Sequence, residues 1–308
     1  MCIKERNTSD STCKKLLRDK GCFADLCNYA FFQGRQVIQP EELVSRENDL
    51  STLIGKIDKP TEIKRYRDVV RKASIHGEYV IIGVEHQSTF DEKMIFRILN
   101  YDATIYINQV ESKQEIYPVG SFVFYTGDKE WKSPETLKET LKNIPSEMEP
   151  YINDWRLPVV ELKTMDARKL TNQRLKEVVE ISQSMFAGNY DDLRNNRKIE
   201  TESFMMAATF TCTNIRREDL PEGDEINMCK AMDQLFQRFE NQGMEKGETI
   251  GFEKGKLNTL KELLKVKLGT LSSPLEKQLT NTSLEKLNEL TLNIFNVTNE
   301  EDILRIIN

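Results

Sequence analysis

Residues 78–87, EYVIIGVEHQ, decide the fold, because this run of apolar side chains ends in three polar ones. Its length and its β-branched residues predict a buried strand. Since successive side chains of a strand point to opposite faces of a sheet, Glu85 and Gln87 should share one face and His86 should lie on the other. A charge at the end of so apolar a strand costs free energy unless something pairs with it. We therefore expect Glu85 to be either ion-paired or functional.

The segment before this strand is predicted to be its hairpin partner. Residues 65–71, RYRDVVR, have strand character, and His76-Gly77 supplies the turn. Further helices are predicted at 11–33, 91–112 and 133–143, further strands at 117–126 and 157–163, and mostly helix from 168 to 240. This order predicts an α/β fold, with one mixed sheet flanked by helices.

The C-terminal part of the chain has a different pattern. Glycine recurs every four residues at Gly243, Gly247, Gly251 and Gly255. Each glycine inside a helix costs about 1 kcal/mol relative to alanine. Because this spacing puts the four near one helical face, the repeat is either a seam for close helix packing and homo-oligomer formation, or a charged spacer.

We divide the chain accordingly into a large α/β domain at 1–240, a charged connector at 241–256 and a small helical unit at 257–308. In the last unit, Ser273 and Thr282 are the expected N-cap residues, since each is followed three residues later by glutamate. The leucines that follow supply an apolar face, which favours packing or partner contact.

Charge is unevenly distributed along the 308 residues, whose formal net charge is −6. Residues 1–75 hold 15 Lys and Arg against 11 Asp and Glu, whereas residues 76–308 hold 29 against 39. The basic excess marks the N-terminal quarter as the place to look for an anionic ligand.

Several classes of protein are excluded by composition. No apolar run approaches the ~18 residues of a membrane-spanning helix, and the N-terminus lacks the apolar stretch of a secretory signal. The six cysteines form no Cys-x-x-Cys pair, and neither His76 nor His86 has zinc-site spacing from a cysteine. We expect a cytoplasmic protein with reduced thiols and no membrane partner.

Two acidic residues, Asp68 and Glu85, indicate a candidate metal-binding site. Asp68 lies 17 positions before Glu85, and a tight hairpin would bring the two level. Together with a main-chain carbonyl and an amide oxygen they make an all-oxygen site, which suits Mg²⁺ or Mn²⁺. The basic residues around Asp68 would let phosphate approach; they are Lys64, Arg65, Arg67, Arg71 and Lys72. The alternative is a plain salt bridge from Glu85 to Arg67 or Arg71.

Four segments carry a resemblance to a known family: DKGCFADLCNYAFFQGRQVIQPEEL at 19–43, YRDVV at 66–70, IIGVEHQSTFDEKMIFRILNYDA at 81–103 and YPVGSFVFYTGDKEW at 117–131. The most distinctive part is EHQS followed by a helix with Met94, Arg97 and Tyr101. Residues 10–240 resemble the recombination-promoting nucleases, a transposase-related group within the PD-(D/E)XK superfamily. The resemblance implies a restriction-endonuclease-like core and metal-dependent cleavage of DNA phosphodiesters.

The resemblance also implies roles for individual residues. Asp68 and Glu85 match the two metal-binding acids, and the main-chain carbonyl of His86 would be a third Mg²⁺ or Mn²⁺ ligand. Gln87 stands where the superfamily most often has lysine. Its amide can position water or phosphate, but it supplies no positive charge.

Auxiliary roles follow from the same resemblance. Lys72 or Arg97 could supply the charge that Gln87 lacks. An acidic residue of the first helix, Asp19 or Asp25, could join the site. Arg97 and Tyr101 lie one helical turn apart, so the alternative for them is packing over the sheet and pairing with Glu85 or Asp68.

Two functions are consistent with these residues. The first is a Mg²⁺-dependent DNA endonuclease linked to recombination or mobile elements, with Asp68, Glu85 and Gln87 as its catalytic set. The second is a catalytically inactive nuclease-like protein that binds DNA or assembles through the glycine repeat and C-terminal helices. Gln87 and the weak positive charge favour the second. His86 is expected to pack away from the site.

Overall fold

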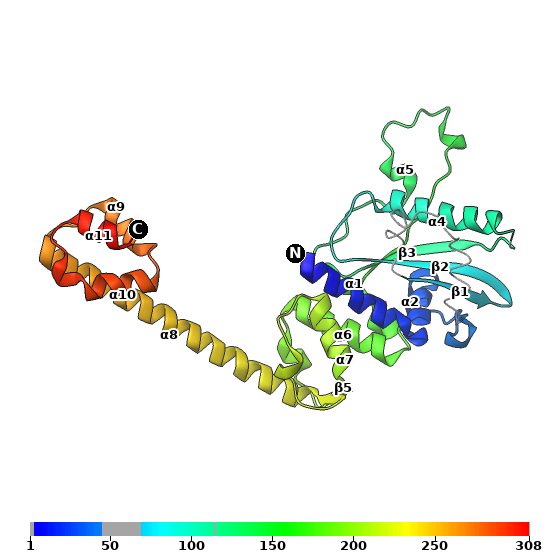
Figure 1. The fold of residues 1–308 in the computed structure, drawn as a ribbon. Coiled ribbons are helices and arrows are strands. Elements are labelled where there is room, and N and C mark those ends of the chain that lie inside the picture. Colours follow the sequence, from blue (N-terminus) through cyan, green and yellow to red (C-terminus); the bar gives the residue numbers. More distant parts are fainter. Residues whose placement is uncertain (1–2, 45–68, 114, 308) are drawn as a thin grey trace. The chain divides into compact units, whose positions relative to one another are not determined.

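The strand that the sequence predicts at 78–87 forms the second strand of a four-stranded mixed sheet (Figure 1). The computed structural model describes residues 3–44, 69–113 and 115–307. For residues 3–7 and 242 it describes the backbone only. The chain divides into two units, Met1–Gln234 and Leu235–Asn308.

The sheet has the strand order β1-β2-β3-β4. These strands are Val69–Ile75, Glu78–Gln87, Val119–Tyr125 and Val159–Glu161. β1 is antiparallel to β2, whereas β2–β3 and β3–β4 are parallel. The predicted turn joins β1 to β2: His76 and Gly77 have φ of 52° and 89°, and a two-residue hairpin turn of this kind requires positive φ at both positions. The α/β architecture with a mixed sheet is confirmed.

Helices cover both faces of the sheet (Figure 1). One face packs on α1 (Ile3–Arg18), α2 (Lys20–Phe32), α6 (Gln173–Ala187) and α7 (Thr201–Phe210). The other packs on α4 (Met94–Glu111). Side-chain alternation divides the strands: Ile82 and Val84 of β2 belong to the first core, whereas Ile81 belongs to a cluster with Ile105 of α4.

The N-terminal helix differs from its prediction. Residues 11–33 are not one helix, because α1 ends at Arg18 and α2 starts at Lys20. Asp19 between them is the N-cap of α2, and its carboxylate accepts a hydrogen bond from the Cys22 amide at 2.8 Å. An N-cap aspartate satisfies an amide that the first helical turn leaves without a partner.

Two other elements are much shorter than predicted, and a third region contains strands that were not predicted. Of the predicted helix 133–143 only α5 (Leu137–Thr140) forms, and Leu141 after it is extended. Leu141 is exposed, so the apolar face of a longer helix would have no core to pack against here. The strand predicted at 157–163 is limited to β4 and runs into a 3-10 turn. The helical region 168–240 also contains a small antiparallel pair, β5 (Lys198–Glu200) and β6 (Glu225–Asn227).

Short 3-10 turns connect the other elements. They lie at Pro40–Glu42, Glu149–Tyr151, Leu162–Thr164, Ala167–Lys169, Tyr190–Leu193, Arg217–Asp219 and Ile294–Asn296.

The C-terminal helices have a core of their own. α8 (Met228–Leu268) runs without a break through the four glycines, and α9 (Ser273–Thr280), α10 (Leu284–Leu292) and α11 (Glu300–Ile307) follow. Leucines and isoleucines of these helices form one buried cluster. The N-caps are Ser272 and Ser283, one residue away from the predicted positions. Within the described part of the chain, every helix falls short of the length or apolarity that crossing a bilayer requires.

Candidate functional site

Glu85 lies near the carboxyl end of β2 and is almost fully buried, with 5% of its surface exposed. Its Oε1 accepts a hydrogen bond from the Arg97 guanidinium at 2.8 Å and lies 3.4 Å from the Gln87 amide nitrogen. Glu85 and Gln87 therefore share one face of the sheet, as predicted, and Arg97 of α4 reaches down to them.

Arg97 connects the buried carboxylate to the surface. Its second terminal nitrogen donates to Asp91 at 3.0 Å, and 40% of its side chain is exposed. Burial opposes the charge, but hydrogen bonds with Tyr101 and Asp91 and the attraction of Glu85 raise the pKa of Arg97 above its usual value. The charged guanidinium of Arg97 thus lies between the buried Glu85 carboxylate and solvent.

His86 points to the opposite face, also as predicted. Its Nδ1 lies 2.8 Å from a carboxylate oxygen of Asp10, and its Nε2 lies 2.8 Å from the Thr126 hydroxyl and 3.5 Å from that of Ser9. The whole residue is 2% exposed. It is a packed residue of the core.

The main-chain carbonyl of His86 has a defined direction. The Gln87 carbonyl accepts a hydrogen bond from the Thr126 amide, which follows β3. Because successive carbonyls of a strand point to opposite neighbours, the carbonyl of His86 points towards the β1 side of β2. That is the side on which Val69, the first described residue of β1, pairs with Val84.

Asp68, the other predicted metal ligand, lies outside the described residues, as do Lys64, Arg65 and Arg67. The salt bridge considered between Glu85 and Arg71 does not form. Arg71 points to the other face, where it donates to the carbonyls of Leu17 and Arg18 at 3.0 and 2.8 Å.

Lys72 is engaged away from Glu85. In the β1–β2 register Lys72 lies opposite Ile81, which is four residues before Glu85 on β2. Its ammonium lies over the rings of Tyr79 and Tyr117, at 4.1 and 3.7 Å from the ring centroids. Tyr101 lies in the α4 core with 8% of its surface exposed and contributes a hydrogen bond to Arg97. Of the predicted auxiliary cations, Arg97 is thus the one placed at Glu85.

Both acidic candidates of the N-terminal helices have their hydrogen-bond partners away from Glu85. Asp19 caps α2, as described above. Asp25 is 2% exposed and accepts hydrogen bonds from the backbone amides of Thr171 and Asn172 at 2.8 Å each and from Gln36 at 3.0 Å. Asp25 therefore fixes the segment before α6 against α2.

The donors at this end of β2 suit a hard cation but are incomplete. Within the described ranges, no three His, Cys, Asp or Glu side chains come close enough together to hold a metal ion. Glu85, the His86 carbonyl and the Gln87 amide offer oxygen atoms of the kind that Mg²⁺ and Mn²⁺ prefer. A second carboxylate would have to come from elsewhere in the chain.

Sequence reasoning missed two contributors. Asp91 accepts a hydrogen bond from Arg97 and holds it in place. The sequence feature that could have indicated this role is the position of Asp91, between the EHQS strand and the helix that follows it. Asp10 binds His86 from 76 residues away, and no local pattern marks it. Both are acidic residues whose partners are set by the packing of a helix on β2.

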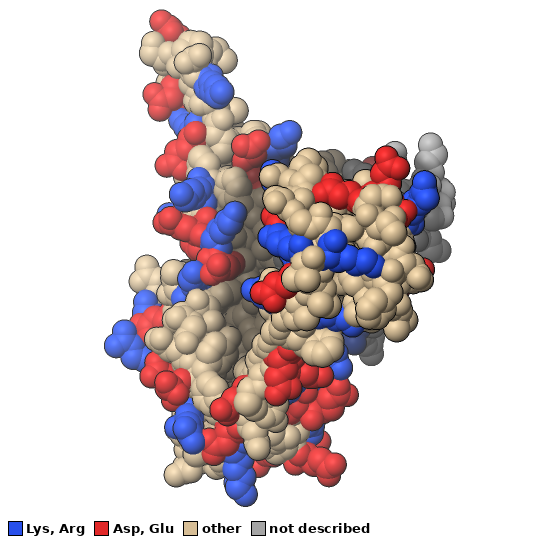
Figure 2. Space-filling model, turned by 90° about the vertical axis from the view of Figure 1, so that its left-hand side faces the viewer, with Lys and Arg blue, Asp and Glu red and all other residues tan. Residues whose placement is uncertain are grey.

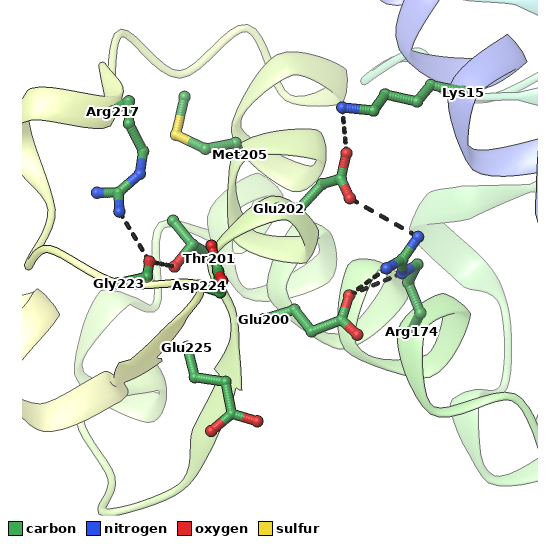
Figure 3. Close-up of a pocket in the computed structure, with 10 residues that line it drawn as sticks. All are labelled: Lys15, Arg174, Glu200, Thr201, Glu202, Met205, Arg217, Gly223, Asp224 and Glu225. Atoms are coloured by element: carbon green, nitrogen blue, oxygen red, sulfur yellow. Dashed lines mark hydrogen bonds and ion pairs between the residues drawn. The ribbon is translucent and has the colours of Figure 1, made fainter.

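A separate cavity of about 630 Å³ lies in the first unit (Figure 3). Its cationic side chains already have partners: Lys15 pairs with Glu202, Arg174 with Glu200 at 2.7 Å, and Arg217 donates to the Gly223 carbonyl at 2.8 Å. None of the predicted site residues lines it. Because two of these cations are paired with carboxylates of the cavity and the third is bound to a main-chain carbonyl, the cavity offers little to select an anionic ligand.

The comparisons with known proteins agree with the motif at β2. A family model described as "Putative transposase, YhgA-like" matches residues 61–210. This range contains all four strands of the sheet, α4 and Glu85. For these residues the match confirms the resemblance to the transposase-related nuclease group. No curated protein and no solved structure matches the chain.

Proposed function

We propose that the protein is a metal-dependent DNA endonuclease with a PD-(D/E)XK-like core, acting in the movement or recombination of DNA. The observation that carries this proposal is a buried glutamate at the end of the central strand, bound by an arginine that reaches solvent, within the range of the transposase-related match.

Asp68 is proposed as the second carboxylate. The hairpin register supports this role, because Val69 pairs with Val84 and these two are the chain neighbours of Asp68 and Glu85. Asp68, Glu85 and the His86 carbonyl would hold Mg²⁺ or Mn²⁺. Such an ion, when bound, activates water and stabilises the departing oxygen.

The remaining residues act through contacts that the described structure supports. Arg97, charged and 40% exposed in its side chain, can bind a phosphate oxygen by charge-assisted hydrogen bonds. Gln87, beside Glu85, can orient a water molecule or a phosphate oxygen through its amide. Tyr101 and Asp91 keep the guanidinium of Arg97 charged and in place.

The test is nicking of supercoiled plasmid in Mg²⁺ by the full chain. Asp68→Ala and Glu85→Gln should each lose roughly 100-fold or more of the nicking rate. Glu78→Gln is the matched control, since Glu78 lies on the same strand but is exposed at its other end. Equal nicking by the wild type and Asp68→Ala would remove the assignment.

A second candidate function is DNA binding and assembly without cleavage. On the face drawn in Figure 2, Lys and Arg side chains are mixed with Asp and Glu over most of the surface, which favours weak, salt-sensitive DNA binding. On α8, Gly243 and Gly247 share a helical face with Phe236 and Ile250, which are 38% and 51% exposed.

We propose that this face of α8 packs against a second copy of the chain. Within the described residues, a Cβ at Gly247 would meet no atom within 4 Å, so Gly247→Ala should stabilise a lone helix by about 1 kcal/mol. In a packed pair the added methyl group would instead weaken association. Light scattering measures the oligomeric state and thermal unfolding measures the stability, so together they distinguish a lone helix from a packed pair. A monomeric wild type and a more stable Gly247→Ala variant would contradict assembly.

A further inference from the structure

Three aromatic rings lead outward from the site. Tyr125 of β3 is the register partner of Gln87 and is 2% exposed. Trp131 packs on Tyr125 with the ring centroids 5.1 Å apart, and Phe90 packs on Trp131 at 5.4 Å, with interplanar angles of 67° and 71°. The row ends at the surface, because Phe90 is 44% exposed.

Phe90 is tied to the candidate site by its chain neighbour. Asp91 accepts from Arg97 at 3.0 Å, and the same guanidinium donates to Glu85 at 2.8 Å. One arginine side chain therefore separates the Phe90 loop from the carboxylate at the end of β2. A nucleotide whose phosphate met Arg97 would have its base near this ring.

The two loops that carry the row are held by several hydrogen bonds. The Lys93 amide donates to the Asp91 carboxylate at 3.0 Å, and the Ser133 hydroxyl donates to the Glu92 carbonyl at 3.4 Å. The Trp131 amide donates to Glu161 at 3.1 Å. A ring fixed in this way loses little conformational entropy when a ligand stacks on it.

The two loops have no excess of positive charge with which to bind a phosphate backbone. Residues 88–93 and 127–133 together contain three lysines and four acidic residues. Non-specific binding to duplex DNA depends on a surplus of cations. What the loops offer instead is the open side of an aromatic ring, on which any base can stack.

We propose that Phe90 stacks on an unpaired nucleobase beside the phosphate bound at Arg97, so that the substrate is DNA with unpaired nucleotides. The inference rests on the proposed DNA-acting function and names its substrate class. In an intact duplex both faces of each base are covered by neighbouring bases, so a ring at the surface finds a partner only at a single-stranded, bulged or frayed position.

The experiment uses the full chain and an oligonucleotide with 2-aminopurine at an unpaired position, because stacking quenches the fluorescence of this base. Wild type should quench it, and Phe90→Ala should lose the quenching and bind about tenfold more weakly. Phe90→Trp should restore both. Phe96→Ala is the control, since Phe96 has nearly the same exposure, 45%, but lies on α4.

The outcomes separate this proposal from the nuclease assignment. Quenching that depends on Phe90 supports the stacking role whether or not Mg²⁺ brings cleavage, whereas absent cleavage counts only against the nuclease. Equal quenching by wild type and Phe90→Ala, or tighter binding to the fully paired duplex, overturns it. Unchanged thermal unfolding of Phe90→Ala would show that lost quenching is not lost folding.

Discussion

Two adjacent residues of β2, Glu85 and His86, are buried to nearly the same extent, yet their surroundings differ completely. His86 meets Asp10, Thr126 and Ser9 among the helices of the first core. Glu85 meets Arg97, whose side chain is 40% exposed. One face of the strand is closed by protein, and the other opens through an arginine to solvent.

The difference separates the part of the strand that fixes the fold from the part that can do chemistry. On the closed face, each ring nitrogen of His86 lies within hydrogen-bonding distance of a partner supplied by a distant segment, which anchors α1 and the end of β3 to β2. On the open face, Glu85 and Gln87 point to the α4 side, where a ligand can reach Arg97. The open face depends on the closed one, because both belong to the same stretch of backbone.

The largest expected effect is on the closed face. His86→Ala removes a buried ring and leaves the buried Thr126 hydroxyl without this partner, so we expect a loss of about 3 kcal/mol in the free energy of unfolding. Urea denaturation measures it. His76→Asn is the control and should be nearly neutral, since His76 lies in an exposed turn at φ 52°, which asparagine tolerates. A loss under about 1 kcal/mol for His86→Ala would mean that the closed face is not what anchors the strand.

An intermediate effect is expected where the open face meets the core. Arg97→Met keeps the apolar stem but takes the cation from a buried carboxylate, and the cost should be about 1–2 kcal/mol at pH 7, less than for a fully buried pair because Arg97 is partly exposed. Arg97→Lys keeps a cation near the buried carboxylate, so part of the loss should be recovered in that variant. Equal losses for Arg97→Met and Arg97→Lys would show that charge burial is not the cause.

The sequence predicted the hairpin and the two faces of β2 because these features are local. A two-residue turn at His76-Gly77 and strict side-chain alternation determine them. Pairing of Arg97 with Glu85 is one of the alternatives that the one-turn spacing of Arg97 and Tyr101 leaves open. The strand Val69–Ile75 extends beyond the predicted 65–71 at its C-terminal end, up to the turn.

Other features depended on contacts that no local pattern contains. Helical spacing continues across Asp19, so the break between α1 and α2 shows only in the capping hydrogen bond. The residues at 133–143 have helical periodicity, but Leu141 finds no core to pack on. The Asp10–His86 contact joins residues 76 positions apart. At 133–143, the lack of tertiary packing overrode a local preference for helix.

The smallest expected effect tests how open the Glu85 face is. Gln87 is half-buried and its amide nitrogen lies 3.4 Å from Glu85, so Gln87→Lys places an ammonium beside a carboxylate that can accept it. The free energy of unfolding should change by less than about 0.5 kcal/mol. If phosphodiester cleavage is limited by the missing positive charge, the same variant should nick plasmid faster than wild type. A strong destabilisation would show instead that the face is closed around Gln87 as it is around His86. Among the described residues, Arg97 would then remain as the cation placed at Glu85.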